Sequence, residues 1–99
     1  MAYDRKKLEL MLDRIPQGKV TTHGTLAPYN DTTPRALAKA ICSSESIGRI
    51  RVLLKGGRFP HPENEYDCLE RAAFLRSEGL KISENNRRVI MDEKEMWKP

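Results

Sequence analysis

The sequence is poor in cysteine, in aromatic residues and in long apolar runs. Its only two cysteines, Cys42 and Cys68, lie 26 residues apart without a Cys-x-x-Cys pair, and His23 and His61 are the only histidines. Because this spacing does not fit zinc ligands, we expect two free thiols and no metal site. No apolar run approaches the ~18 residues of a membrane span, so we expect no membrane partner.

Glycine-rich phosphate loops are also missing. Gly56 and Gly57 stand together without the third glycine or the Gly-Lys-Ser/Thr ending that cradles a nucleotide. We therefore expect no nucleotide hydrolysis and no cofactor. The first residues, MAYDRKK, lack the apolar stretch of a secretory signal, which favours an intracellular, soluble protein.

The charge of the chain is concentrated in its middle. The 99 residues, 38% hydrophobic and 32% charged, are typical of one folded domain spanning residues 1–99. Residues 14–60 carry eight basic and two acidic side chains, whereas residues 1–13 have a net charge of 0 and residues 61–99 of −2. A basic segment of this kind indicates contact with nucleic-acid phosphates, and a merely solvated surface is the alternative.

Three helices are expected in the first 42 residues. Apolar residues at helical spacing after Asp4, a capping residue, predict a helix over residues 5–14. After an extended Val20-Thr21, Thr22 caps a short helix over residues 23–29. Thr33 then caps a third helix, with Pro34 at its first position, where the missing N–H costs nothing.

The third helix has two distinct faces. Leu37, Ala40 and Ile41 form a stripe toward the core, and the opposite face holds Arg35, Ala38, Lys39 and Cys42. A basic face of small residues suits close approach to DNA, and two helices joined by a tight turn form a helix-turn-helix. An ordinary helix with solvated Arg and Lys is the alternative.

The second half predicts a small β element and a fourth helix. Branched residues before the Gly56-Gly57 turn predict a hairpin over residues 50–59, the wing. Leu69, Ala72, Ala73 and Leu75 or Arg76 fit a helix that ends at Gly79, followed by short extended pieces through Trp97. The fold class is therefore mainly α with a small β-wing, a winged helix-turn-helix in a single domain.

Several segments carry a family resemblance. Residues 15–27 (IPQGKVTTHGTLA) resemble the opening of the DNA-binding domain of O6-alkylguanine-DNA alkyltransferases. Further similarities follow in order at residues 35–41 (RALAKAI), Arg51-Val52 and residues 69–79. The closing MWKP is similar to the tail of the alkyltransferase-like proteins, the non-enzymatic branch of that family.

The resemblance implies a winged helix-turn-helix that enters the minor groove and rotates an alkylated guanine out of the stack. Arg35 matches the arginine that fills the vacated position, a task that suits a planar guanidinium. The residues matched to DNA-binding positions are Thr21, Thr22, His23, Arg35, Ala36 and Lys39. The implied partners of this expected monomer are double-stranded DNA carrying alkylated guanine and excision-repair proteins, in the cytoplasm with the nucleoid or in a nucleus.

The enzymatic residues of the family are replaced. Where the enzymes carry Pro-Cys-His-Arg-Val, this sequence reads GRIRV at residues 48–52, so Arg49 and Ile50 stand at the nucleophile and base positions. Only Glu78 matches the third member, and a carboxylate without an imidazole cannot generate a thiolate. We expect no enzyme; alkyl transfer to Cys42 or Cys68 is the alternative to their being buried, small apolar residues.

Arg49, Ile50 and Trp97 are the lesion-pocket candidates, because relatives place Trp at the Arg49 position and near the C-terminus. Alternatively, Arg49 points to phosphate and Trp97 closes the edge of the core. If a strand begins at Arg49, alternation sends Arg49 and Arg51 to one face and Ile50 and Val52 to the other. For Arg51 we favour a structural salt bridge to Glu78 over DNA contact.

His23 replaces the Tyr that crowds a phosphate in the family. A protonated imidazole would bind that phosphate instead, and a surface residue on a short helix is the alternative. The stretches between His23 and Arg35, and between Arg35 and Arg51, are about two and three residues shorter than the family norm. The leading hypothesis is non-enzymatic recognition of O6-alkylguanine that marks it for excision repair. A winged helix-turn-helix binding DNA or protein without lesion recognition is the alternative.

Overall fold

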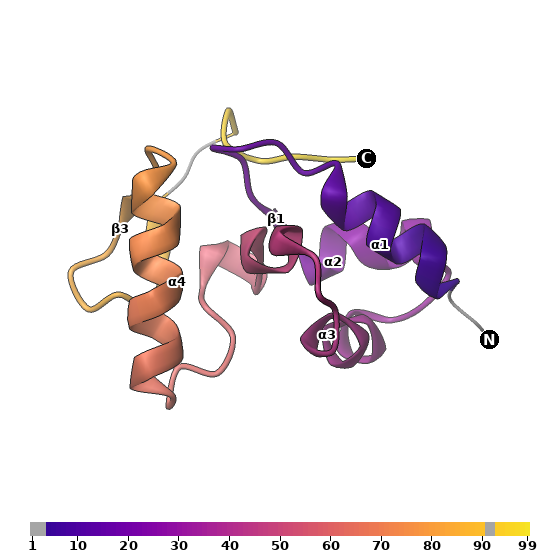
Figure 1. The fold of residues 1–99 in the computed structure, drawn as a ribbon, viewed down its shortest axis with the longest axis horizontal. Coiled ribbons are helices and arrows are strands. Elements are labelled where there is room, and N and C mark those ends of the chain that lie inside the picture. Colours follow the sequence, from indigo (N-terminus) through magenta and orange to yellow (C-terminus); the bar gives the residue numbers. More distant parts are fainter. Residues whose placement is uncertain (1–3, 91–92) are drawn as a thin grey trace.

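The amino-terminal helix begins where its capping residue was expected. A computed structural model of the chain describes residues 4–90 and 93–99 (Figure 1). In helix α1 (Arg5–Asp13), the Asp4 carboxylate accepts hydrogen bonds from the backbone N–H groups of Lys6 (3.0 Å) and Lys7 (3.3 Å). This satisfies donors that a helix leaves free at its start. The inward residues Leu8 and Leu12 are fully buried, which confirms the predicted helix.

The helix-turn-helix is formed by α2 (His23–Leu26), the 3₁₀ helix η1 (Ala27–Asn30) and α3 (Pro34–Cys42). The Thr22 hydroxyl accepts from the N–H of Thr25 (3.1 Å), and the Thr33 hydroxyl accepts from the N–H of Ala36 (3.2 Å). Both predicted caps are confirmed. Asp31, in the left-handed region with φ 53°, turns the chain between them.

The hairpin predicted over residues 50–59 is wrong. Residues 47–51 form a 3₁₀ helix, η2 (Ile47–Arg51), and β2 (Val52–Leu53) pairs in parallel with β1 (Thr21–Thr22), Thr21 opposite Val52. Gly56 and Gly57, both at positive φ, do make a turn within η3 (Lys55–Gly57). The chain after that turn pairs elsewhere, because Arg58 forms an antiparallel bridge with Arg88.

Helix α4 (Glu65–Ser77) starts four residues before Leu69, the first residue named for the predicted helix. Asn64 caps it, and Glu65 and Asp67 favour this start because acidic groups stabilise a helix N-terminus. The buried residues of this helix are Cys68, Ala72 and Leu75, whereas Leu69 and Ala73 are exposed. Gly79, at φ 92°, follows the helix end as expected.

Strands β3 (Lys81–Ile82) and β4 (Val89–Ile90) form the antiparallel pair of the fold. They fall in the segment expected to hold short extended pieces. The fold class, mainly α with a small winged β element, is confirmed, and the antiparallel element is built by residues 81–90.

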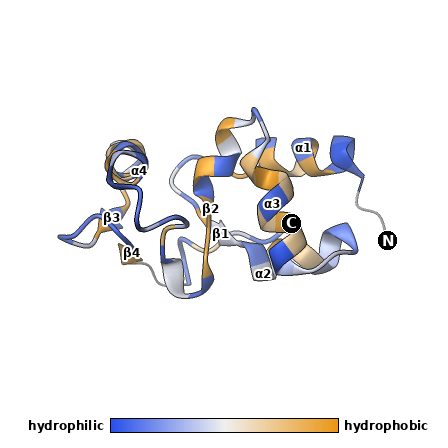
Figure 2. Ribbon diagram, turned by 90° about the horizontal axis from the view of Figure 1, so that it is seen from below, coloured by the Kyte–Doolittle hydropathy of each residue, from blue (hydrophilic) through white to orange (hydrophobic). Residues whose placement is uncertain are grey.

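The parallel β1–β2 pair lies between two apolar clusters. Figures 1 and 2 show α1, α2 and α3 on one side of it and α4 with its neighbouring strands on the other. Val52 packs in the first cluster with Leu12 and Leu37, whereas the next residue, Leu53, packs in the second with Phe59 and Leu75. Opposite faces of one short strand therefore serve both clusters. Among the described helices, none combines the length and the apolar character of a membrane span.

Candidate nucleic-acid interface

The outward stripe of α3 runs along the wall of a cavity. Arg35, Ala38, Lys39 and Cys42 are three or four residues apart and share one helix face. Ala38, Lys39 and Cys42 line the cavity, and Arg35 lies one turn before Lys39. Arg35 is exposed, and its side chain makes no hydrogen bond or ion pair with the residues that the structure describes. The predicted division of this helix into a core face and an outward face is confirmed for Leu37, Ala40 and Ile41.

This cavity, called here the α3 cavity, has a volume of about 710 Å³, enough for a nucleobase. It opens between α3 and the segment that runs from β2 into α4. Its lining residues from the first half of the chain are His23, Ala38, Lys39, Ile41, Cys42 and Arg49. The second half contributes Val52, Leu54, Pro60, His61, Asn64, Asp67 and Arg71.

His23 belongs to the wall of the α3 cavity and is only 6% exposed. Burial lowers the pKa of His23; a hydrogen bond with the Leu53 backbone opposes this and the charge of Arg71 adds to it. The imidazole is therefore neutral near pH 7, and its Nδ1 has no hydrogen-bond partner. The expectation of a surface residue is wrong, and a neutral ring lacks the charge expected to attract phosphate.

Two arginines line the α3 cavity, Arg49 from η2 and Arg71 from α4. The Arg71 side chain is 10% exposed; its Nη1 donates to the Ile50 carbonyl oxygen (3.0 Å), and its Nη2 lies 4.0 Å from the Asp67 carboxylate. The Nε of Arg71 is buried without a partner. Arg49 is exposed, and its Nε donates to the Ser44 carbonyl oxygen (3.1 Å). Arg49 thus lines the α3 cavity, and its place in a lesion pocket stays a prediction.

The two cysteines differ from each other. Both are free thiols, as expected; Cys68 is buried, which confirms its predicted packing role, but Cys42 is exposed. The sulfur of Cys42 lies 3.6 Å from Nε2 of His61, whose Nδ1 is 3.8 Å from the Glu63 carboxylate. The expectation that Cys42 is a buried apolar residue is wrong because it belongs to the outward face of α3.

The other predicted DNA-binding residues differ in their exposure to solvent. Ala36 and Lys39 are exposed on α3. Thr21 is fully buried in β1, and the hydroxyl of the buried Thr22 caps α2. The side chain of Thr21 is thus not available to DNA, because it is completely buried in the strand that pairs with β2.

Two of the three lesion-pocket candidates lie outside the α3 cavity. Ile50 packs against the second apolar cluster, and Trp97 packs against the first beside Met11. The N–H of Trp97 donates to the Val20 carbonyl oxygen (2.7 Å), which fixes it at the core edge, as the alternative interpretation expected. Ile50 and Trp97 are therefore not among the residues that line the α3 cavity.

The predicted Arg51–Glu78 ion pair is confirmed. Nε of Arg51 donates to both carboxylate oxygens of Glu78, at 3.0 and 3.2 Å, and its Nη2 also contacts this carboxylate. The strand expected to begin at Arg49 is wrong, since Arg49 and Arg51 belong to η2. Within that 3₁₀ helix Arg51 is half-buried while Arg49 is exposed.

Sequence reasoning missed Arg71 and His61 as members of the site. Both belong to residues 61–99, a segment whose net charge is negative and which therefore carries no basic signal as a whole. A signal did exist for Arg71, because it follows Asp67 by four residues and such a pair shares a helix face. His61 has a left-handed backbone (φ 55°), a conformation that no sequence pattern here predicted.

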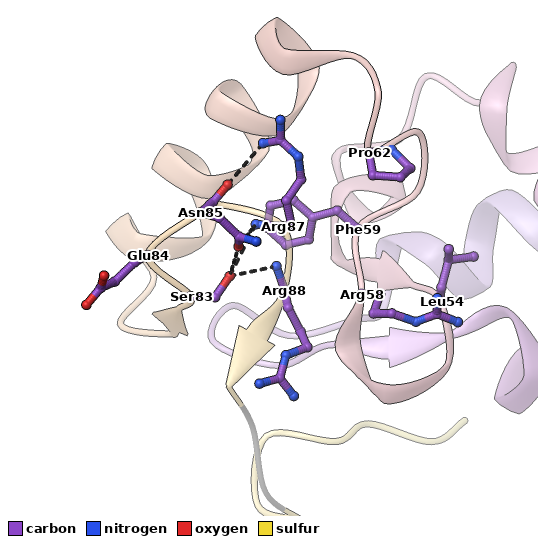
Figure 3. A pocket seen from close by; sticks show the side chains of 9 residues that line it. All are labelled: Leu54, Arg58, Phe59, Pro62, Ser83, Glu84, Asn85, Arg87 and Arg88. Atoms are coloured by element: carbon purple, nitrogen blue, oxygen red, sulfur yellow. Dashed lines mark hydrogen bonds between the residues drawn. The ribbon is translucent and has the colours of Figure 1, made fainter.

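A second cavity, of about 640 Å³, lies beside the loop between β3 and β4 (Figure 3). Arg58, Arg87 and Arg88 line it together with Phe59. In the loop the Ser83 hydroxyl accepts from the backbone N–H of Arg87 (3.2 Å) and of Arg88 (3.1 Å), and the buried Oδ1 of Asn86 has no partner. We favour the α3 cavity because the outward face of α3 lines it, including the predicted DNA-binding residue Lys39.

Comparisons with solved structures identify the fold. No protein-family model and no curated protein sequence matches the chain significantly. S. pombe Atl1 in complex with damaged DNA containing O6-carboxymethylguanine matches with a TM-score of 0.77 and 22% identity, over 96% of this chain and 94% of that one. A second structure, S. pombe ATL in complex with DNA, has a TM-score of 0.78 with the same identity and coverage. The chain therefore has the fold of the S. pombe alkyltransferase-like protein.

Proposed function

We propose that the protein binds double-stranded DNA through α3 and accepts an extruded O6-alkylguanine in the α3 cavity, without chemical conversion. The observation that carries this proposal is the continuity of the α3 stripe: it begins at the exposed Arg35 and continues as the cavity wall at Lys39 and Cys42. The structural likeness to a protein bound to damaged DNA supports it.

Arg35 has the placement that base extrusion requires. Its guanidinium is exposed in the first turn of α3. No hydrogen bond or ion pair with a described residue competes with its insertion into DNA. A planar cation inserted through the minor groove can stack in the vacated position and bond to the orphaned base. The extruded base would then enter the adjacent α3 cavity.

We expect no catalysis because of the residues at the two positions that match the family's nucleophile and base. Arg49 supplies no nucleophile, and Ile50 supplies no base. Glu78 is bonded to Arg51 and accepts the N–H of Gly18 (3.0 Å), so it orients no imidazole. Lesion removal would therefore depend on excision-repair proteins, which we propose as partners in the cytoplasm or nucleus.

One observation favours a competing function, alkyl transfer to Cys42. In that reaction the Cys42 sulfur would bond to the alkyl carbon as the carbon–O6 bond breaks, and the thiol proton would pass through His61 to the guanine. However, the Cys42–His61–Glu63 group is exposed, where such polar contacts contribute little. We expect no adduct. Mass spectrometry after incubation with O6-methylguanine DNA tests this, since a gain of about 14 Da on Cys42 would establish transfer.

Fluorescence anisotropy on matched duplexes tests the main proposal. We expect tighter binding to a duplex with O6-methylguanine than to the same duplex with guanine. Equal affinities would instead support a winged helix-turn-helix that binds DNA without lesion recognition. In that case alkylation would not change the affinity. The affinity would fall steeply with increasing salt concentration, because basic side chains contact phosphates.

A further inference from the structure

A further cavity, of about 380 Å³, lies between α1 and residues 97–99, which Figure 1 shows close to that helix. It is called here the α1 groove. Its apolar lining is formed by Leu10 and Met11 of α1 together with Trp97 and Pro99. Met11 and Trp97 are half-buried and pack against the first apolar cluster, whereas Leu10 is 58% exposed. The groove therefore joins an apolar floor, held in place by the core, to an apolar side chain that is open to solvent.

Basic side chains accompany this apolar lining. Lys6, Lys7 and Arg14 line the α1 groove and are exposed, and their side chains make no hydrogen bond or ion pair with the residues that the structure describes. The acidic lining residue is Asp4, whose carboxylate already accepts from two backbone N–H groups at the start of α1. Three cations thus stand against one carboxylate, which favours an anionic ligand.

The α1 groove lies apart from the proposed DNA-binding site. Lys7, Leu10 and Arg14 follow one another at intervals of three or four residues, so they share one face of α1 and its continuation. A different face carries Arg5 and Glu9, which form an ion pair and bond to the residues just after α3. The groove therefore faces away from the contact between α1 and the end of α3, and it shares no lining residue with the α3 cavity.

A protein segment fits this combination of groups better than a nucleic acid does. A duplex offers phosphates to the basic side chains, but it keeps its bases stacked inside and would leave Leu10 uncovered. A single strand stacks successive bases on aromatic side chains, and Trp97 is the aromatic residue of this groove. An acidic segment with aliphatic side chains matches both features, because its carboxylates pair with the cations while its apolar groups displace water from the floor.

We propose that the α1 groove is the docking site of a protein partner, which binds it through an acidic segment that carries leucine-like side chains. This inference rests on the proposed function in one respect, since the partner would act on the DNA that the protein has marked. The docking itself needs no lesion. Because the groove and the α3 cavity are separate, the protein can hold DNA and its partner at the same time.

The test uses Trp97, the only tryptophan of the sequence, as a reporter inside the groove. The probe is a short synthetic peptide of glutamates with two leucines four residues apart and no aromatic residue. One control peptide has glutamine in place of every glutamate, and the other has serine in place of both leucines. We expect the probe to shift the emission of Trp97 saturably to shorter wavelengths, and each control peptide to bind about tenfold more weakly.

Variants of the protein assign the binding to the groove. Leu10→Gln should weaken binding of the probe about tenfold, and so should Lys7→Gln combined with Arg14→Gln. Lys55→Gln combined with Lys81→Gln also removes two exposed charges, but outside the groove, and should leave the affinity unchanged. All these side chains are exposed, so the variants should keep the melting temperature of the original protein.

The outcomes separate this inference from the proposed function. Equal binding of the three peptides, or an unchanged affinity in both Leu10→Gln and the Lys7 and Arg14 double variant, overturns the inference. Displacement of the probe by a guanine duplex or by oligothymidine at physiological salt would assign the groove to nucleic acid and also overturn it. If the probe binds as expected while O6-methylguanine and guanine duplexes bind equally, the docking site stands and lesion recognition does not.

Discussion

Arg51 and Glu78 join the two halves of the molecule through a nearly buried ion pair. Their side chains are 13% and 4% exposed, and Arg51 also donates to the Ile15 carbonyl oxygen (3.0 Å). Glu78 accepts in addition from the N–H of Gly18 (3.0 Å), which the chain holds at φ 84°. The pair thereby connects η2, the end of α4 and the turn before β1.

Replacing Glu78 should destabilise the protein and flatten its acid response. Burial alone would raise the pKa of Glu78, but the hydrogen bonds from Arg51 and Gly18 and the charge of Arg51 lower it below its ordinary 4.5. A lowered pKa gives stability that is complete above the ordinary value and is lost as the pH falls below it. Glu78→Gln should cost about 3 kcal/mol at pH 7, because Arg51 remains buried without its partner.

Urea denaturation between neutral pH and about pH 3 measures both effects, and Glu70→Gln, an exposed site on the same helix, is the control. An unchanged midpoint and an unchanged pH slope in Glu78→Gln would contradict this account.

Acidification through the ordinary pKa of histidine should also weaken the fold. The buried His23 has a pKa lowered from 6.5, so the unfolded chain binds a proton more readily than the folded one. Stability is complete above 6.5 and falls as the pH drops below it. Thermal melts from pH 8 to 5 should show this slope, which His23→Gln removes and the exposed His61→Gln retains. A wild-type curve without slope in this range would show that His23 is not buried as a neutral ring.

Gly48 should tolerate no side chain. A Cβ at this position would lie 1.9 Å from the Leu12 carbonyl oxygen, because η2 packs directly against α1. Gly48→Ala should therefore cost about 3 kcal/mol, roughly 12 °C or more in Tm. Gly24→Ala is the matched control, since its Cβ would meet no atom closer than 3.9 Å. Equal melting temperatures for the two variants would place η2 farther from α1.

Arg35→Ala should weaken lesion binding more than Lys39→Ala. Only Arg35 can fill the vacated stack, and loss of a stacking side chain costs about 1–3 kcal/mol, on the order of tenfold in affinity. The comparison uses O6-methylguanine, a neutral adduct, so that the charge of Lys39 acts alike on lesion and guanine duplexes. Equal losses for the two variants would argue against stack insertion.

Local signals in the sequence predicted most of the first half of the fold. Asp4, Thr22 and Thr33 cap their helices through groups two or three residues away, and the stripe of Leu37 and Ile41 follows from helix geometry. Such interactions can be read from neighbouring residues alone. The ion pair of Arg51 was predictable only through a family resemblance, because its partner is 27 residues distant.

Non-local pairing explains what the sequence could not predict. The turn at Gly56 was recognised, and across it the N–H of Leu54 donates to the Arg58 carbonyl oxygen (2.8 Å). Leu53, however, pairs with Thr22 and Arg58 with Arg88, so the flanking segments do not pair with each other as strands. Arg71 was not predicted as a site residue for the same reason. It reaches the α3 cavity only because α4 packs against η2. Periodicity within α4 does not contain that information.

The β1–β2 pair, with two residues in each strand, also determines whether the chain can be split into two folded parts. Val52 completes the apolar cluster of the first three helices, yet it follows them in sequence and is inseparable from Leu53, which the other cluster requires. If the chain were cut after Ser46, the amino-terminal piece would lack Val52, and Leu12 and Leu37 would become exposed. The carboxyl-terminal piece would lack Val20, which belongs to its apolar cluster. Each apolar cluster thus depends on a residue from the other part of the chain, so we expect that neither part folds alone.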